Sequence, residues 1–115
     1  MRVLIVDDEE LDLFIHKKLL SLEFETAGFT SVKDALAWAA QNDFDVAIID
    51  YYLGTGIYAN HMLKELIAIR GATFKAFVAT NYVNDKQVID LRASGFTDII
   101  YKPLTLEILN SKLGL

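Results

Sequence analysis

The chain has 115 residues, of which 53% are hydrophobic and 23% charged, so it is expected to fold as one domain with a packed core. Its 16 acidic and 11 basic residues give a net charge of −5, which disfavours binding to nucleic acid or to anionic membranes. The absence of cysteine excludes disulfides, thiolate zinc sites and cysteine nucleophiles.

The N-terminal apolar stretch is too short for a secretory signal, because it meets Asp7 and Asp8 after a few residues. No apolar run approaches the roughly 20 residues that a membrane-spanning helix needs. We therefore expect a single cytoplasmic domain over residues 1–115.

Five short apolar runs alternate with five segments of helical spacing. The runs are mostly continuous and β-branched, which is typical of strands whose two sheet faces are both covered. The second run is assigned as a strand mainly from its place in the order. The predicted strands are residues 3–6, 24–26, 46–49, 74–79 and 99–101.

The first helical segment carries an apolar stripe at spacings of three and four residues, which we expect to face the sheet. Asp12, Lys17 and Lys18 mark its opposite side. His16, next to the two lysines, is predicted to lie on the surface, as is His61 further along the chain. Trp38 and Phe44 are expected to pack between helix and sheet. The stripe consists of Leu11, Phe14, Ile15, Leu19 and Leu22.

The remaining helical segments follow the second to fifth strands. Thr30 or Ser31 is a candidate N-cap for the second helix, and Asn84 or Asp85 for the fourth. This regular alternation of strand and helix predicts an α/β domain with a parallel sheet and helices on both of its faces.

Polar residues stand where four of the predicted strands end. Asp7 and Asp8 follow the first strand, Asp50 the third, Thr80 ends the fourth and Lys102 follows the fifth. Parallel strands all point the same way, so these side chains should gather at one edge of the sheet. Ligands of open α/β sheets bind at this edge, outside the carboxyl ends of the strands.

The gathered residue types favour phosphoryl transfer. Three crowded carboxylates repel one another unless a cation neutralises them. Mg²⁺ prefers oxygen ligands and is often held by one or two carboxylates plus a phosphate oxygen, and Lys102 offers a second positive charge. A carboxylate can itself accept the phosphoryl group as an acyl phosphate.

Four short motifs occur in order along nearly the whole chain, and together they are far more specific than any one of them alone. They are Asp7-Asp8, Asp50 after Ala47-Ile48-Ile49, Val78-Ala79-Thr80, and Gly95-Phe96-Thr97-Asp98 leading to Tyr101-Lys102-Pro103. In this arrangement the chain resembles the CheY-like receiver domain of two-component response regulators. The resemblance implies a single doubly wound, flavodoxin-like (βα)5 domain, with five parallel strands in the order 2-1-3-4-5.

The resemblance also assigns roles at the predicted site. Asp50 would be phosphorylated by a phosphohistidine of a sensor histidine kinase or phosphotransfer protein. Mg²⁺ would be bound by Asp8, Asp50 and the backbone carbonyl of Tyr52, with Asp7 acting mainly through water. The domain would be a signalling switch and not an enzyme.

Thr80 and Lys102 would hold the phosphoryl oxygens, and the Lys102–Pro103 bond would be cis. Phosphorylation would draw Thr80 inward and shift the surface made by the fourth helix, fifth strand and fifth helix. That surface would control a downstream target protein or an output domain, without direct contact to nucleic acid or membrane. Relatives with output domains commonly form homodimers through it, and the sequence leaves this open.

Two features depart from the family pattern. Ile99 stands where the family usually has Tyr or Phe, so coupling between the hydroxyl residue and a swinging ring is not expected, although Tyr101 on the same strand face is a candidate substitute. Gly54 replaces the usual proline in the loop after Asp50. We hypothesise that the rings of Tyr52 and Tyr82, each two residues beyond a site residue, slow loss of the phosphoryl group.

The same residues allow other interpretations. Asp7 and Asp8 also suit the start of a helix. Ile99 and the unusual loop favour a degenerate receiver that binds partners without a phosphate cycle. A phosphatase of the haloacid-dehalogenase type needs a second acid where Tyr52 stands, and neither a P-loop nor a dinucleotide motif is present. The tyrosines around the site loops suit either packing or a partner surface.

Overall fold

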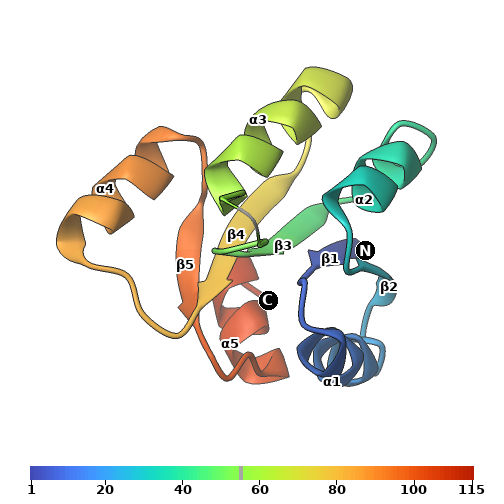
Figure 1. Ribbon diagram of the computed structural model, residues 1–115. Coiled ribbons are helices and arrows are strands. Elements are labelled where there is room, and N and C mark those ends of the chain that lie inside the picture. Colours follow the sequence, from blue (N-terminus) through green and yellow to red (C-terminus); the bar gives the residue numbers. More distant parts are fainter. Residues whose placement is uncertain (55) are drawn as a thin grey trace.

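The computed structural model describes residues 1–54 and 56–115. Five parallel strands form one sheet in the order β2-β1-β3-β4-β5, as the resemblance implied (Figure 1). The predicted first, third, fourth and fifth strands are each confirmed to within one residue at either end. The strands are β1 (Arg2–Val6), β2 (Glu25–Phe29), β3 (Val46–Asp50), β4 (Lys75–Thr80) and β5 (Asp98–Tyr101).

Helices cover both faces of the sheet. Two clusters of buried residues separate the layers: one lies under α2, α3 and α4, and the other under α1 and α5. Figure 1 shows α1 and α5 on one side of the strands and the other three helices opposite. The helices are α1 (Glu10–Leu20), α2 (Val32–Ala39), α3 (Ala59–Arg70), α4 (Asp85–Ala93) and α5 (Leu106–Leu113).

The central strands are apolar throughout because each of their faces meets a core. In β1, Leu4 and Val6 belong to the core under α2 to α4, whereas Val3 and Ile5 belong to the core under α1 and α5. Burial on both faces explains why the sequence shows continuous apolar runs instead of alternation. In the described part of the chain, none of the helices has the length and apolar character needed to cross a membrane.

The second strand lies later than predicted. It spans Glu25–Phe29 and pairs with β1 from Arg2 to Val6, whereas the apolar run was placed at residues 24–26. Phe24 is buried, but it packs in the core under α1 and α5 before the strand begins. The strand includes Gly28, where a Cβ would lie only 2.8 Å from Leu13 Cδ1, so α1 approaches β2 closely at this point.

The predicted buried face of α1 is wrong. Phe14, Ile15 and Leu11 are exposed, whereas His16 and Leu20 are buried and Leu13 is partly buried against the sheet. The short connection from β1 and the close approach of Leu13 to Gly28 set the rotation of the helix. The prediction that His16 lies on the surface is therefore also wrong, while His61 is exposed as expected.

Side-chain caps set the start of three helices. The Ser31 hydroxyl accepts from the Asp34 amide at α2, Thr105 accepts from Ile108 at α5, and Asn84 accepts from Gln87 at α4. The first helix begins after Glu9, which makes no side-chain cap. Trp38 and Phe44 pack between α2 and the sheet with ring centroids 6.0 Å apart, as predicted.

Candidate functional site

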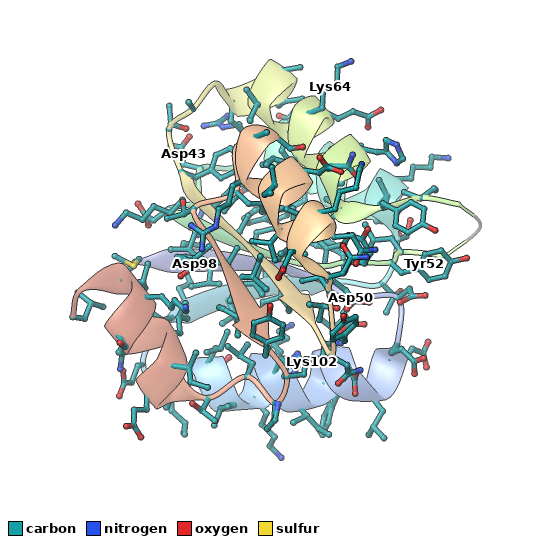
Figure 2. All side chains as sticks on the ribbon, turned by 90° about the vertical axis from the view of Figure 1, so that its left-hand side faces the viewer. Asp43, Asp50, Tyr52, Lys64, Asp98 and Lys102 are labelled. Carbon is teal, nitrogen blue, oxygen red and sulfur yellow. The ribbon has the colours of Figure 1, made fainter. Side chains whose placement is uncertain are left out.

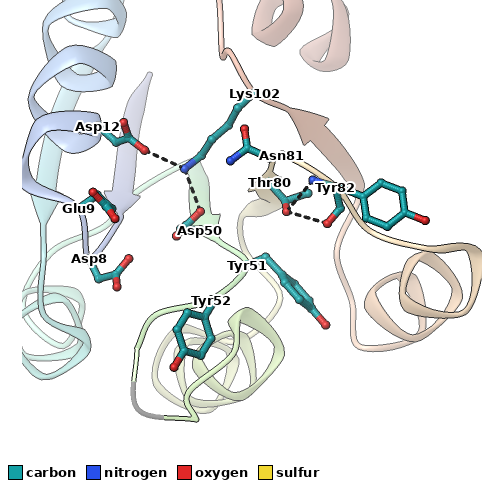
Figure 3. Close-up of a pocket in the computed structure, with 10 residues that line it drawn as sticks. All are labelled: Asp8, Glu9, Asp12, Asp50, Tyr51, Tyr52, Thr80, Asn81, Tyr82 and Lys102. Atoms are coloured by element: carbon teal, nitrogen blue, oxygen red, sulfur yellow. Dashed lines mark hydrogen bonds and ion pairs between the residues drawn. The ribbon is translucent and has the colours of Figure 1, made fainter.

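The carboxyl ends of the strands carry a pocket of about 460 Å³, lined mainly by polar side chains (Figure 3). Asp50 ends β3, Thr80 ends β4, and Lys102 follows β5. Figure 2 shows Asp50 and Lys102 together at this end of the sheet, away from Asp98 at the other end. The pocket is lined by Asp8, Glu9, Asp12, Asp50, Tyr51, Tyr52, Thr80, Asn81, Tyr82 and Lys102.

Three aspartates form an acidic cluster in and beneath this pocket. Asp7, Asp8 and Asp50 each offer a carboxylate oxygen, and these oxygens lie within 4.8 Å of one another. Asp7 is buried, Asp50 is partly buried and Asp8 is exposed, so the cluster opens to solvent on one side. A compact set of hard oxygen donors fits Mg²⁺, which needs few protein ligands and keeps several waters.

The loop after β3 closes one side of the acidic cluster. Gly54 has a φ of +90°, and a Cβ at this position would lie 3.5 Å from Asp8 Oδ2. Glycine tolerates this conformation, which places the backbone of the loop next to Asp8. Tyr52 precedes it and lines the pocket with a ring that is about half exposed.

Lys102 neutralises much of this charge. Its Nζ lies 3.0 Å from Asp50 Oδ1, 3.3 Å from Asp7 Oδ2 and 3.2 Å from Asp12 Oδ2. Burial acts to lower the pKa of Lys102, but the hydrogen bond and charge of Asp50, together with Asp7 and Asp12, outweigh it and raise that pKa above its ordinary value. The ammonium group is therefore charged at every physiological pH. The Lys102–Pro103 bond is cis, as the resemblance implied.

Asp50 titrates closer to neutrality than an ordinary aspartate. Burial is the main cause, and the charges of Asp7 and Asp8 add to it, so the pKa of Asp50 rises to about 6 although Lys102 opposes the shift. The three acids and one lysine carry a net negative charge at neutral pH. Divalent cations are the natural complement of such a site.

Thr80 faces the same pocket but takes no part in this ionic network. Its side chain is buried, and its Oγ1 donates to the Tyr82 carbonyl at 3.2 Å and accepts from the Tyr82 amide at 3.3 Å. Behind it, Ile99 is only 4% exposed and fills the core under α4. Tyr101 pairs in register with Thr80 but lies at the surface.

The place of Asp12 in the pocket was not predicted. Asp12 was placed on the polar side of the first helix, yet it binds Lys102. Tyr51 packs against Tyr58 with centroids 5.4 Å apart, and its hydroxyl accepts from Gln87 Nε2 at 3.2 Å, which connects the end of β3 to α4.

The tyrosines divide into two groups. Tyr58 packs against both Tyr51 and Tyr52, whereas Tyr82 is 74% exposed on the loop after β4.

His16 of α1 is buried. Burial lowers the pKa of His16, and the charge of Lys102 lowers it further. This histidine is therefore neutral at pH 7 and packs as part of the interior.

The doubly wound sheet, with an acidic pocket outside the carboxyl ends of its strands, defines a class of ligand-binding α/β domain. The sequence profile of the response regulator receiver domain matches residues 3–113. The chain therefore belongs to the response regulator receiver domain family, the CheY-like modules of two-component signalling. Receiver domains are typically signalling switches and not enzymes, and they bind Mg²⁺ at an acidic pocket of this kind.

Solved structures share the fold at low sequence identity. A CheY-like receiver domain protein from Methanospirillum hungatei JF-1 is 24% identical with a TM-score of 0.84, over 98% of this chain and 90% of that one. Chemotaxis protein CheY4 of Vibrio cholerae is 23% identical with a TM-score of 0.87, over 98% and 95%. A Burkholderia pseudomallei response regulator with a phosphorylated aspartic acid and a calcium ion is 18% identical with a TM-score of 0.86, over 97% and 65%. The search of curated proteins found no match.

Proposed function

We propose that this receiver domain is the phosphoacceptor switch of a two-component phosphorelay, with Asp50 as the acceptor. The observation that carries the proposal is the position of the Asp50 carboxylate, between the other two acids and the ammonium group of Lys102. A carboxylate oxygen of Asp50 would attack the phosphorus of a phosphohistidine. The P–N bond would break, a P–O bond would form, and the histidine would leave as a neutral imidazole after taking up a proton.

Mg²⁺ would be held by Asp8, Asp50 and the Tyr52 backbone carbonyl, with Asp7 acting mainly through water. When bound, the ion would neutralise charge on the phosphoryl oxygens. Its binding would also favour the ionised form of Asp50, whose raised pKa otherwise leaves part of the nucleophile protonated near pH 6. A structural relative, the Burkholderia pseudomallei protein, was crystallised with a phosphorylated aspartate and a calcium ion, which supports this proposal.

Thr80 and Lys102 would bind the phosphoryl oxygens. To do so, the Thr80 hydroxyl would give up its bonds to the Tyr82 backbone, and the loop that leads into α4 would shift with it. The surface of α4, β5 and α5 would change in consequence, including the exposed side chains of Ile89 and Tyr101. This surface would act on a downstream target protein or an output domain, and a homodimer through it is compatible with the proposal.

The phosphodonor would be a sensor histidine kinase or phosphotransfer protein. Leu11, Phe14 and Ile15 form an apolar surface on α1, and each of these residues is more than half exposed. They are neighbours in the sequence of the site residues Asp8 and Asp12. Exposed apolar patches of this kind on small domains commonly mark protein interfaces. We propose that this α1 surface binds the donor.

Intact mass after incubation with acetyl phosphate and Mg²⁺ tests the proposal. One phosphoryl adduct is expected in the wild-type protein, and none in Asp50→Asn or after addition of EDTA. Asp85→Asn, on the exposed start of α4, is a control that should leave the adduct unchanged.

The second candidate is a degenerate receiver that binds partners without a phosphate cycle. The buried aliphatic Ile99 favours it, because no ring is available at that position to report the movement of Thr80. The same incubation separates the two functions. Absence of an adduct with acetyl phosphate and also with phosphoramidate, in a folded protein that binds Mg²⁺, would favour the degenerate receiver.

A further inference from the structure

Lys102 has as many carboxylate partners as it has hydrogens to donate. An ammonium group offers three N–H donors. Asp50, Asp7 and Asp12 each place an oxygen within 3.3 Å of Nζ, and Lys102 is 11% exposed (Figure 3 shows the contacts with Asp12 and Asp50). Two of its N–H groups donate to Asp7 and Asp12, and Asp50 lies against it as an ion pair, so these contacts are in place before any phosphoryl group arrives.

The three partners differ in their freedom to leave. The Asp7 side chain is 3% exposed and that of Asp50 is 14% exposed, and both belong to the acidic cluster. The Asp12 side chain is 42% exposed and lies on the first turn of α1, outside that cluster. Asp12 can therefore leave Lys102 and be solvated by water. Asp7 would remain a buried charge without its partner if it lost Lys102.

A phosphoryl group on Asp50 needs N–H donors of Lys102, and the carboxylates of Asp7 and Asp12 compete with it for them. We propose that Asp12 is a positioning residue: it holds the Lys102 ammonium in the unphosphorylated state and competes with the phosphoryl group for it. This inference rests on the proposed function. Asp12 neither forms nor breaks a covalent bond; it sets how readily Lys102 changes partner.

Removing the Asp12 charge should therefore favour the phosphoryl-bound state. In Asp12→Asn, Lys102 keeps the charged partners Asp7 and Asp50, and its third partner is neutral and is displaced more easily. We expect binding of beryllium fluoride, an analogue of the phosphoryl group, to tighten about fivefold in the presence of Mg²⁺, and phosphorylation by acetyl phosphate to accelerate by a similar factor. Asp12→Glu, which retains the charge at the end of a flexible side chain, should remain near the wild type.

Glu9→Gln is the matched control. Glu9 lines the same pocket and carries the same charge, but its side chain makes no contact with Lys102 in the described structure. The affinity for beryllium fluoride can be measured from the amide NMR signals of Thr80 and Tyr82 during a titration at saturating Mg²⁺. A purely structural role for Asp12 would lower the midpoint of thermal unfolding and leave this affinity unchanged.

The outcomes are distinct. Tighter binding in Asp12→Asn but not in Glu9→Gln supports the competition. Equal tightening in both variants assigns the effect to the general field of the pocket and overturns the inference, as does an unchanged affinity in Asp12→Asn. If the wild-type protein binds no beryllium fluoride and gains no phosphoryl group, the proposed function itself fails, and the inference fails with it.

Discussion

The two halves of the pocket are built in different ways. On one half, Asp7, Asp12 and Asp50 surround Lys102, and every distance from Nζ is 3.3 Å or less. On the other half, the hydroxyl of Thr80 bonds to the backbone of Tyr82 two residues away, beside an exposed loop. The first half is held by strong, mutually dependent charges, and the second by two neutral hydrogen bonds. In the proposed function, the phosphoryl chemistry would take place at the ionic half, and the movement of Thr80 would take place at the neutral half.

The largest expected effect breaks the ionic half. Lys102→Met should slow phosphorylation of Asp50 by acetyl phosphate about 100-fold, because a preorganised positive charge opposite the transferring group is lost. Intact mass against time measures the rate. Lys112→Met is the control, since Lys112 also forms an ion pair, with Asp98, but lies outside the pocket. Equal rates in Lys102→Met and Lys112→Met would contradict the role given to Lys102.

The same charges make the ionic half a source of instability at neutral pH. Because burial raises the pKa of Asp50 from 3.8 to about 6, the folded protein retains a proton on Asp50 between these values that the unfolded chain has lost. The contribution of Asp50 to the free energy of unfolding is therefore most favourable below about pH 4, and it is lost as the pH rises through about 6. Asp50→Asn should then raise the free energy of unfolding by about 2 kcal/mol at pH 7 without Mg²⁺.

Urea unfolding at pH 7 and at pH 4 measures this difference. The gain in Asp50→Asn should shrink towards zero at pH 4, where the wild-type carboxyl is already protonated. Saturating Mg²⁺ should also reduce it, because the ion stabilises the wild-type fold selectively. A gain that is the same at both pH values would mean that the charge of Asp50 is not its cause.

The comparison also explains what the sequence could predict. Site residues at strand ends were predictable, because a parallel sheet brings its carboxyl ends to one edge whatever the details of packing. Asp12 and His16 were not, since their position depends on the rotation of α1. That helix has apolar residues on more than one side, and its spacing alone favoured the face that carries Phe14. The close approach of Leu13 to Gly28 decides the rotation, and it is a tertiary contact without a local signal.

The position of the second strand was predicted wrongly for a related reason. Ala27 and Gly28 lack the large β-branched or aromatic side chains that are typical of a strand, and none of the residues of β2 is fully buried. Its pairing with β1 comes from the sheet and not from its own preference. Whether Tyr101 replaces the ring that Ile99 lacks depends on movement upon phosphorylation, which a pattern of residues does not specify.

The smallest expected effect concerns the neutral half and its rim. Tyr52 lines the pocket beside Asp50, and Tyr82 lies on the loop that binds Thr80, with exposures of 47% and 74%. If these rings restrict the approach of water to the acyl phosphate, the double variant Tyr52→Ala and Tyr82→Ala should lose its phosphoryl group a few times faster. The expected change in the hydrolysis rate is small because only the access of water changes. The lifetime is measured by intact mass after removal of the donor. Leu22→Ala, at an exposed residue outside the pocket lining, is the control. A lifetime in the double variant equal to that of the wild type would exclude shielding by the rings.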